Sequence, residues 1–135
     1  MRIWLVRVLI AIVTAWNIQA AIDFIFSPEL FVHAYELSGV AGEAAVRGVG
    51  VLFLMWNIPY LFAIIDPIRF RLGVLLALLM QATGLIGECY IFSTLPRDHE
   101  VLRSSIIRFV EFDGAGFVLL VMAWLLLWKR NPPDN

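Results

Sequence analysis

The 135-residue chain has 61% hydrophobic and 16% charged residues, a mean hydropathy of +0.87 and a formal net charge of -1. This composition excludes an ordinary soluble domain, and the near-neutral charge excludes a bulk attraction to nucleic acid. The single cysteine, Cys89, excludes an internal disulfide. We therefore expect one transmembrane domain over residues 1–135, with no separate domain outside the bilayer.

Four apolar stretches predict four membrane-spanning helices, at about 3–26, 44–65, 72–92 and 106–128. Each reaches the roughly 20 helical residues that cross the hydrocarbon core of a bilayer. The first stretch is similar to a signal peptide, but Arg7 interrupts it, so we expect an uncleaved first span. The predicted fold class is therefore all-α, an integral-membrane four-helix bundle.

A short helix is expected between the first two spans, over residues 28–37. Pro28 suits the first helical position and Glu29 the first turn. Because the segment has an apolar and a polar face, we expect it to lie in the interface plane. The polar face of Glu29, His33 and Glu36 carries metal-ligand types, but we interpret it as the hydrated side and expect no metal site.

The second span contains Pro59, which removes one backbone donor and predicts a kink. Residues 93–105 are polar enough to predict a loop between the third and fourth spans. His99 lies between Asp98 and Glu100 in this loop, and we expect it to be solvated.

The distribution of basic residues favours cytoplasmic termini (N-in, C-in). Cytoplasmic flanks of membrane spans carry an excess of Lys and Arg, counted over short loops. One side of the predicted bundle carries Arg2, Arg7, Arg69, Arg71, Lys129 and Arg130. The other side carries Arg47, Arg97, Arg103 and Arg108.

Ionisable residues lie about one turn inside each apolar stretch, all near the outer predicted end. Asp23, Arg47, Glu88 and Asp113 interrupt the spans there. An ionisable residue within a membrane span is a functional-site hypothesis by default. The sequence therefore predicts a polar pocket near the outer face. Its candidate residues are Asp23, Glu88, Gln19, Gln81, Arg47, Asn57 and Asp113.

A second interpretation of the same residues stays open. The charges can mark the headgroup boundary of short helices, with Arg108 and Glu111, three residues apart, as a structural ion pair. On this interpretation Asn17, Asn57 and Gln81 are hydrogen-bonding groups between helices.

The chain is similar to the DoxX-like group of small bacterial membrane proteins. The similarity rests on four short spans, on Asp23 near the end of the first span, and on the run Phe112-Asp113-Gly114-Ala115-Gly116. This run most resembles the BphX-like members, which are linked to aromatic-degradation gene clusters. The resemblance implies a multi-pass protein of the bacterial inner membrane, with a possible role as an accessory subunit beside a redox enzyme. It supplies no catalytic residue.

Three hypotheses of function follow. The first is binding of a small amphipathic or quinone-like ligand in the polar pocket, as an accessory subunit or homo-oligomer. The second is a membrane-embedded acid/base enzyme, such as a lipid-like isomerase, in which Asp23 and Glu88 share a cavity. The third is proton or ion transport by an oligomer. The sequence leaves open whether the protein is an enzyme. The expected partners are the bilayer, the ligand and a membrane or redox enzyme, with no cofactor and no nucleic acid.

Overall fold

The computed structural model describes residues 1–128, and every regular element among them is helical. The all-α prediction is therefore confirmed for this part of the chain. Lys129 and Arg130, which entered the charge comparison, and the tail after them lie outside the described residues. The elements are α1 (Arg2–Phe26), the 3-10 helices η1 (Pro28–Leu30) and η2 (Val32–Tyr35), α2 (Gly39–Trp56), α3 (Ile58–Ile65), α4 (Arg71–Thr94) and α5 (Glu100–Trp128).

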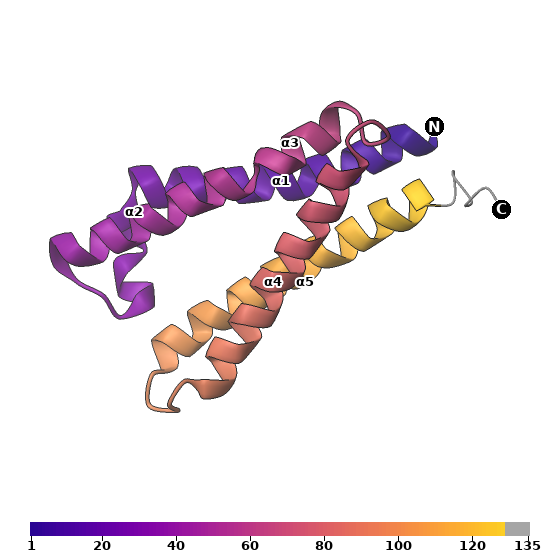
Figure 1. Cartoon of the computed structure of the whole chain (residues 1–135). Coiled ribbons are helices and arrows are strands. Elements are labelled where there is room, and N and C mark those ends of the chain that lie inside the picture. The colour runs from indigo at the N-terminus through magenta and orange to yellow at the C-terminus, as the bar shows by residue number, and fades with distance from the viewer. Residues whose placement is uncertain (129–135) are drawn as a thin grey trace.

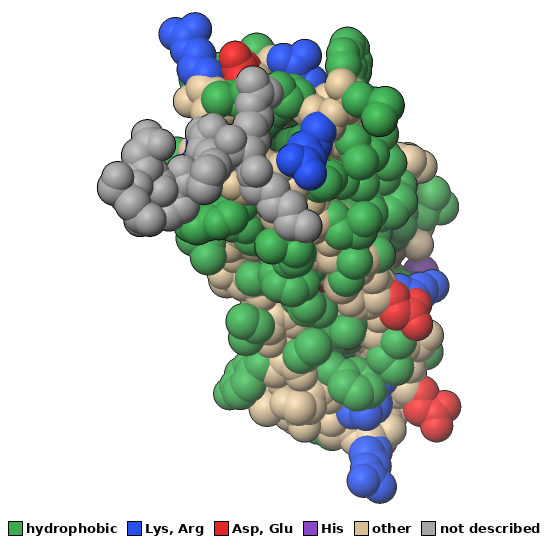
Figure 2. Space-filling view, turned by 90° about the vertical axis from the view of Figure 1, so that its right-hand side faces the viewer, with side chains coloured by type: hydrophobic (Ala, Val, Ile, Leu, Met, Phe, Trp, Pro, Cys, Tyr) green, Lys and Arg blue, Asp and Glu red, His purple; other side chains and the backbone are tan. Residues whose placement is uncertain are grey.

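Four helical stretches are long and apolar enough to cross a membrane. They are Arg2–Phe26, Gly39–Ile65, Arg71–Thr94 and Glu100–Trp128, with 25, 27, 24 and 29 residues. Each exceeds the roughly 20 residues that a bilayer core requires. On the face shown in Figure 2, hydrophobic side chains cover most of the surface, and charged side chains lie at the top, at the right-hand edge and toward the bottom. The four helices are consistent with a multi-pass membrane bundle.

The helices form two hairpins that meet at one end and diverge at the other (Figure 1). The first hairpin is α1 with α2 and α3, and the second is α4 with α5; α1 packs on α5, and α3 packs on α4. We call the end that carries Arg2 and Trp128 the terminal end, and the end that carries η1 and η2 the distal end. The segment η1–η2 contacts α2 and α5 and so fills part of the space between the diverging hairpins.

An aliphatic core lies in the terminal half, where both hairpins contribute. Its buried members come from α1, α3, α4 and α5, and most are small or branched. They are Val6, Leu9, Ile10, Val13, Tyr60, Ala63, Val74, Ala77, Leu120, Ala123 and Leu127. Small residues at a helix interface let the backbones approach closely, which is the main source of helix association in lipid.

A separate, aromatic cluster lies in the distal half. Phe24, Val32 and Val46 are buried there, and the rings of Phe31, Tyr35, Phe53 and Phe109 pack on them. The cluster joins α1, η1–η2, α2 and one residue of α5, with no buried member from α4.

The second span is broken at Asn57, two residues before Pro59. The α2 helix ends at Trp56, and Ile58 begins α3 with the proline in its first turn. Because Pro59 has no N–H and its ring collides with the preceding turn, it cannot continue α2. The structure therefore has a break where the sequence predicts a kink, and it fixes Asn57 between two helices.

Two expectations on the connections need correction. The single helix over 28–37 is replaced by η1 and η2, after which Glu36 has a left-handed backbone (φ 54°). The polar loop over 93–105 is much shorter, because α4 continues to Thr94 and α5 already begins at Glu100. Polar residues at the ends of a span are compatible with helix once they extend beyond the apolar core, and the polarity pattern alone misplaced these boundaries.

Candidate functional site

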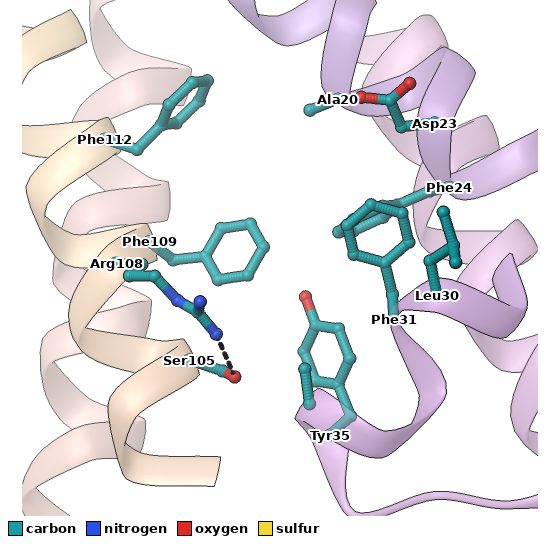
Figure 3. Close-up of a pocket in the computed structure, with 11 residues that line it drawn as sticks. Ala20, Asp23, Phe24, Leu30, Phe31, Tyr35, Ser105, Arg108, Phe109 and Phe112 are labelled. Atoms are coloured by element: carbon teal, nitrogen blue, oxygen red, sulfur yellow. Dashed lines mark hydrogen bonds between the residues drawn. The ribbon is translucent and has the colours of Figure 1, made fainter. Parts of the chain in front are cut away.

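A cavity of about 390 Å³ lies between α1, η1–η2 and α5 at the distal end (Figure 3). Small-molecule sites commonly have volumes of about 300–1,000 Å³ and combine apolar walls with a few polar groups. We call this space the distal cavity. It is lined by Ala20, Asp23, Phe24, Leu30, Phe31, Ala34, Tyr35, Ser105, Arg108, Phe109 and Phe112.

The walls of the distal cavity are mainly aromatic. The Phe24 ring, only 3% exposed, lies 4.7 Å from the Phe31 ring and 6.1 Å from the Phe109 ring, measured between centroids. Tyr35 lies 6.1 Å from Phe109 and so connects η2 to α5. These spacings are within the range of favourable aromatic pairs. The rings therefore form a wall that several segments build together.

Arg108 and Tyr35 are the hydrogen-bond donors of this cavity. One guanidinium N–H of Arg108 donates to the Ser105 hydroxyl at 3.0 Å, and the Tyr35 hydroxyl points into the space before it (Figure 3). Burial raises the pKa of the Tyr35 phenol well above its usual range; the charge of Glu88 adds to the rise and Arg108 opposes it. The phenol is therefore protonated at neutral pH and can donate to a guest.

The ion pair between Arg108 and Glu111 that the spacing predicts is not formed. Within residues 1–128, neither residue takes part in an ion pair, and Arg108 turns toward Ser105, one turn earlier in α5. A spacing of three residues permits contact in either direction along a helix. The guanidinium consequently keeps most of its five N–H donors for another acceptor.

The other predicted charges lie apart from one another. Asp23 is exposed at the rim of the distal cavity, and Gln19 is exposed on the same face of α1. Arg47 is exposed and pairs with Glu43 on its own helix, at 3.5 Å. Glu88 does not line the distal cavity; its buried Oε2 has no hydrogen-bond partner within residues 1–128. Asp23 and Glu88 therefore do not meet in the distal cavity.

Gln81 and Asp113 do come together, in the middle of the bundle. The Tyr60 hydroxyl donates to Gln81 Oε1 at 2.8 Å, and Gln81 Nε2 donates to Asp113 Oδ1 at 2.8 Å. Two glycines leave room for this arrangement. A Cβ at Gly84 would lie 2.7 Å from Asp113 Oδ2, and one at Gly116 would lie 2.8 Å from Gln81 Nε2. The hydrogen-bonded chain therefore links α3, α4 and α5.

A second, small cavity of about 20 Å³ lies beside this chain, and we call it the inner cavity. It is lined by Asn17, Phe53, Trp56, Asn57, Gln81, Phe112 and Asp113. Asn57 is 1% exposed; its amide nitrogen donates to the Phe53 carbonyl at 2.7 Å, and its Oδ1 has no partner within residues 1–128. Phe112 lines both cavities and so lies between them.

A polar contact joins the two hairpins at the distal end. Glu36 bonds the ring nitrogen Nδ1 of His99, and its other carboxylate oxygen accepts the Leu102 N–H at 3.4 Å, in the first turn of α5. His99 is therefore not simply solvated, and Glu36 does not serve only as the hydrated side of a helix. The hydrogen bond to Glu36 raises the pKa of His99, and the same bond lowers the pKa of Glu36. We call this contact the distal clasp.

Sequence reasoning missed most of the residues that line the distal cavity. Phe24, Phe31 and Tyr35 are not among the candidates from the sequence, all of which have charged or amide side chains. A usable signal was present in the fourth span. Ser105, Arg108, Phe109 and Phe112 recur at helical spacing and so lie on one face of α5.

Comparison with protein-family models, with curated proteins and with solved structures finds no match to the chain. The similarity to DoxX-like proteins therefore stays a prediction from short motifs. The contacts within residues 1–128 carry the assignment of roles to individual residues.

Proposed function

We propose that the protein binds a small amphipathic or quinone-like ligand in the distal cavity. The proposal rests on one observation. Arg108 lines an aromatic-walled cavity of about 390 Å³, and no carboxylate within residues 1–128 pairs with its guanidinium. Arg108 is an exposed residue whose guanidinium donates to Ser105, so its remaining N–H groups are available to a ligand oxygen. A hydrogen bond from such a charged donor is among the stronger ones in proteins.

The cavity suits a ligand with an apolar body and an acceptor oxygen. The body packs between the rings of Phe24, Phe31 and Phe109. The oxygen, for example a quinone carbonyl, accepts from Arg108 and from the protonated Tyr35. Asp23 at the rim is available to accept from a hydroxyl at the other end of the ligand.

Equilibrium dialysis of a decyl-substituted benzoquinone against the detergent-purified chain tests this function. A hydrogen bond to a charged group contributes about 1.5–3 kcal/mol, so Arg108→Gln is expected to weaken binding by about tenfold or more. Tyr35→Phe removes a neutral hydrogen bond of about 1 kcal/mol and is expected to weaken binding about fivefold. Arg47→Gln is the matched control, because Arg47 is an exposed arginine outside the cavity. Equal binding by the three variants and the wild type would contradict the proposal.

We further propose that the chain lies in a bacterial inner membrane with both termini in the cytoplasm. The positive-inside rule supports this orientation, because Arg2, Arg7, Arg69 and Arg71 lie toward the terminal end. The η1–η2 segment then lies along the outer interface. Labelling of single cysteines introduced at Asp98 and Arg69, in a Cys89→Ala background, tests the orientation. An impermeant maleimide should label only the Asp98→Cys variant in spheroplasts.

The DoxX-like resemblance supports a further proposal, that the protein acts as an accessory subunit beside a membrane-bound redox enzyme or as a homo-oligomer. Crosslinking in native membranes, followed by mass spectrometry, distinguishes the two arrangements. A chain that is crosslinked to no protein, including itself, would contradict both.

A further inference from the structure

The inner cavity collects polar side chains from all four membrane spans at the depth of the helix break. Asn17 belongs to α1, Asn57 lies between α2 and α3, Gln81 belongs to α4 and Asp113 to α5. Its volume of about 20 Å³ has room for one guest of the size of a water molecule. In membrane proteins, interrupted spans are a recurrent location for bound ions.

Two oxygens around this cavity lack a hydrogen-bond donor. Asn57 Oδ1 is buried and unpartnered in a residue that is 1% exposed, since the amide nitrogen is already bonded to the Phe53 carbonyl. Asp113 Oδ2 has no hydrogen bond within residues 1–128, while Oδ1 accepts from Gln81. Asn17, 8% exposed, lines the same cavity.

Gln81 cannot donate a hydrogen bond to these oxygens. The Tyr60 hydroxyl bonds its Oε1 at 2.8 Å and also contacts the Ala77 carbonyl at 3.1 Å, so the amide is fixed from the α3 side. Its nitrogen already donates to Asp113 Oδ1. The Gln81 amide nitrogen is therefore already engaged and does not donate to Asn57 Oδ1 or to Asp113 Oδ2.

The charge of the site distinguishes between the possible guests. Within residues 1–128, Asp113 has no basic side chain within ion-pair distance. A carboxyl group at this depth either takes up a proton or, if it stays ionised, requires a cation that a neutral water does not replace. Calcium takes six to eight oxygen ligands, and magnesium retains several waters, so neither fits a space for one small guest.

We propose that the inner cavity binds a sodium ion, with Asn57 Oδ1, the Asp113 carboxylate and the Asn17 amide oxygen as ligands. This site is separate from the distal cavity and does not depend on the proposed ligand. Because Phe112 borders both spaces, the ion also supports the wall of the distal cavity.

Thermal unfolding of the detergent-purified full chain tests the site. Sodium chloride is exchanged for choline chloride or potassium chloride at constant ionic strength. A ligand that binds only the folded state raises the unfolding temperature in a saturable way. We expect such a rise with sodium, a smaller one with the larger potassium ion, and none with choline. Equal unfolding temperatures in the three salts would overturn the proposal.

Two variants address the ligands separately. Asp113→Asn keeps the shape of the side chain and removes its charge, and Asn57→Ala removes the unpartnered oxygen. Each is expected to abolish the sodium-dependent shift. Glu111→Gln is the matched control, because Glu111 is an exposed acid on the same helix, and it should keep the full shift. A sodium shift that persists in both ligand variants would overturn the assignment.

Two further measurements keep the proposal testable if a variant fails to fold. Binding of radioactive sodium to the wild-type chain, displaced by excess unlabelled sodium, should reach one ion per chain, and no displaceable binding would contradict the site. Arg108→Gln should retain the sodium shift, which separates a failure of the ion site from a failure of the ligand site.

Discussion

The terminal and distal halves of the bundle pack differently. In the terminal half, Ala63, Ala77 and Ala123 are fully buried where the two hairpins meet. In the distal half, the buried cluster is built around the Phe24 ring, and a cavity of about 390 Å³ remains beside it. The difference shows that side-chain size at the helix interface decides whether two hairpins close or leave a space.

The cause is geometric. Lipid is as apolar as a leucine side chain, so helices in a membrane associate through close packing more than through the hydrophobic effect. At Gly73, a Cβ would lie 3.0 Å from the Pro59 carbonyl oxygen, which shows how closely α3 and α4 approach. Rings such as Phe31 and Phe109 cannot pack at that distance, and they hold the distal ends of the hairpins apart.

The largest loss of stability is expected at a tight contact of the distal half, between α1 and α2. A Cβ at Gly50 would lie 2.9 Å from the Ala21 carbonyl oxygen and 3.0 Å from Phe24 Cβ. Gly50→Ala therefore forces two backbones apart, and we expect a loss of about 3 kcal/mol in the free energy of unfolding, at the upper end of overpacking costs. Titration with a denaturing detergent, followed by tryptophan fluorescence, measures it.

Gly48→Ala is the control for this prediction. It lies on the same helix with open space around its Cβ position, and alanine is the better helix former by about 0.5–1 kcal/mol. The control should therefore be neutral or slightly stabilising. Equal stability of the two variants would show that α1 and α2 are not in backbone contact.

A smaller loss of stability is expected from a substitution that creates a cavity in the terminal half. Leu120 is fully buried, and Leu120→Ala should cost about 2 kcal/mol, the part of the usual Leu→Ala penalty that comes from lost packing. Leu125→Ala on the same helix removes a side chain that is 53% exposed, and it should change stability by less than about 0.5 kcal/mol. The same detergent titration measures both. A similar cost at the two positions would mean that the terminal half is not the closely packed part.

The sequence predicted the four apolar helices and the interruption near Pro59, because long hydrophobic runs and proline act locally. It also identified Gln81, Asn57 and Asp113 as polar residues that need an explanation inside a bilayer. It could not identify Tyr60 as the partner of Gln81, because that contact joins α3 to α4 and depends on how the helices pack.

The residues of the distal cavity were harder to predict for a related reason. Arg108 can contact Ser105 or Glu111 with equal ease along the helix, and the choice depends on what η2 places in front of it. Helical periodicity gives the direction of a side chain from its own axis. It gives neither the rotation of that helix against its neighbours nor the short 3-10 turns that Glu36 and Tyr35 require.

The smallest change in stability is expected at the distal clasp, which connects the diverging ends of the hairpins. The pKa of His99 is raised above its ordinary 6.5, so its contribution to stability is present below pH 6.5 and is lost as the pH rises through the raised value. The pKa of Glu36 is lowered from 4.5, so its contribution is present above pH 4.5 and is lost as the pH falls through the lowered value. Asp98 also favours the protonated His99. The clasp is therefore complete between these two ordinary values.

Hydrogen exchange at the start of α5 measures the clasp, because Glu36 accepts the Leu102 N–H. At about pH 5.5, between the two ordinary values, the Leu102 amide should exchange more slowly in the wild type than in His99→Gln or Glu36→Gln. At about pH 8.5 the wild type and His99→Gln should differ less, because the histidine is then neutral. Comparing proteins at the same pH removes the intrinsic pH dependence of exchange. A difference that is the same size at both pH values would mean that the contact does not depend on a charged His99, and that aromatic packing of η2 on α5 alone joins the hairpins at this end.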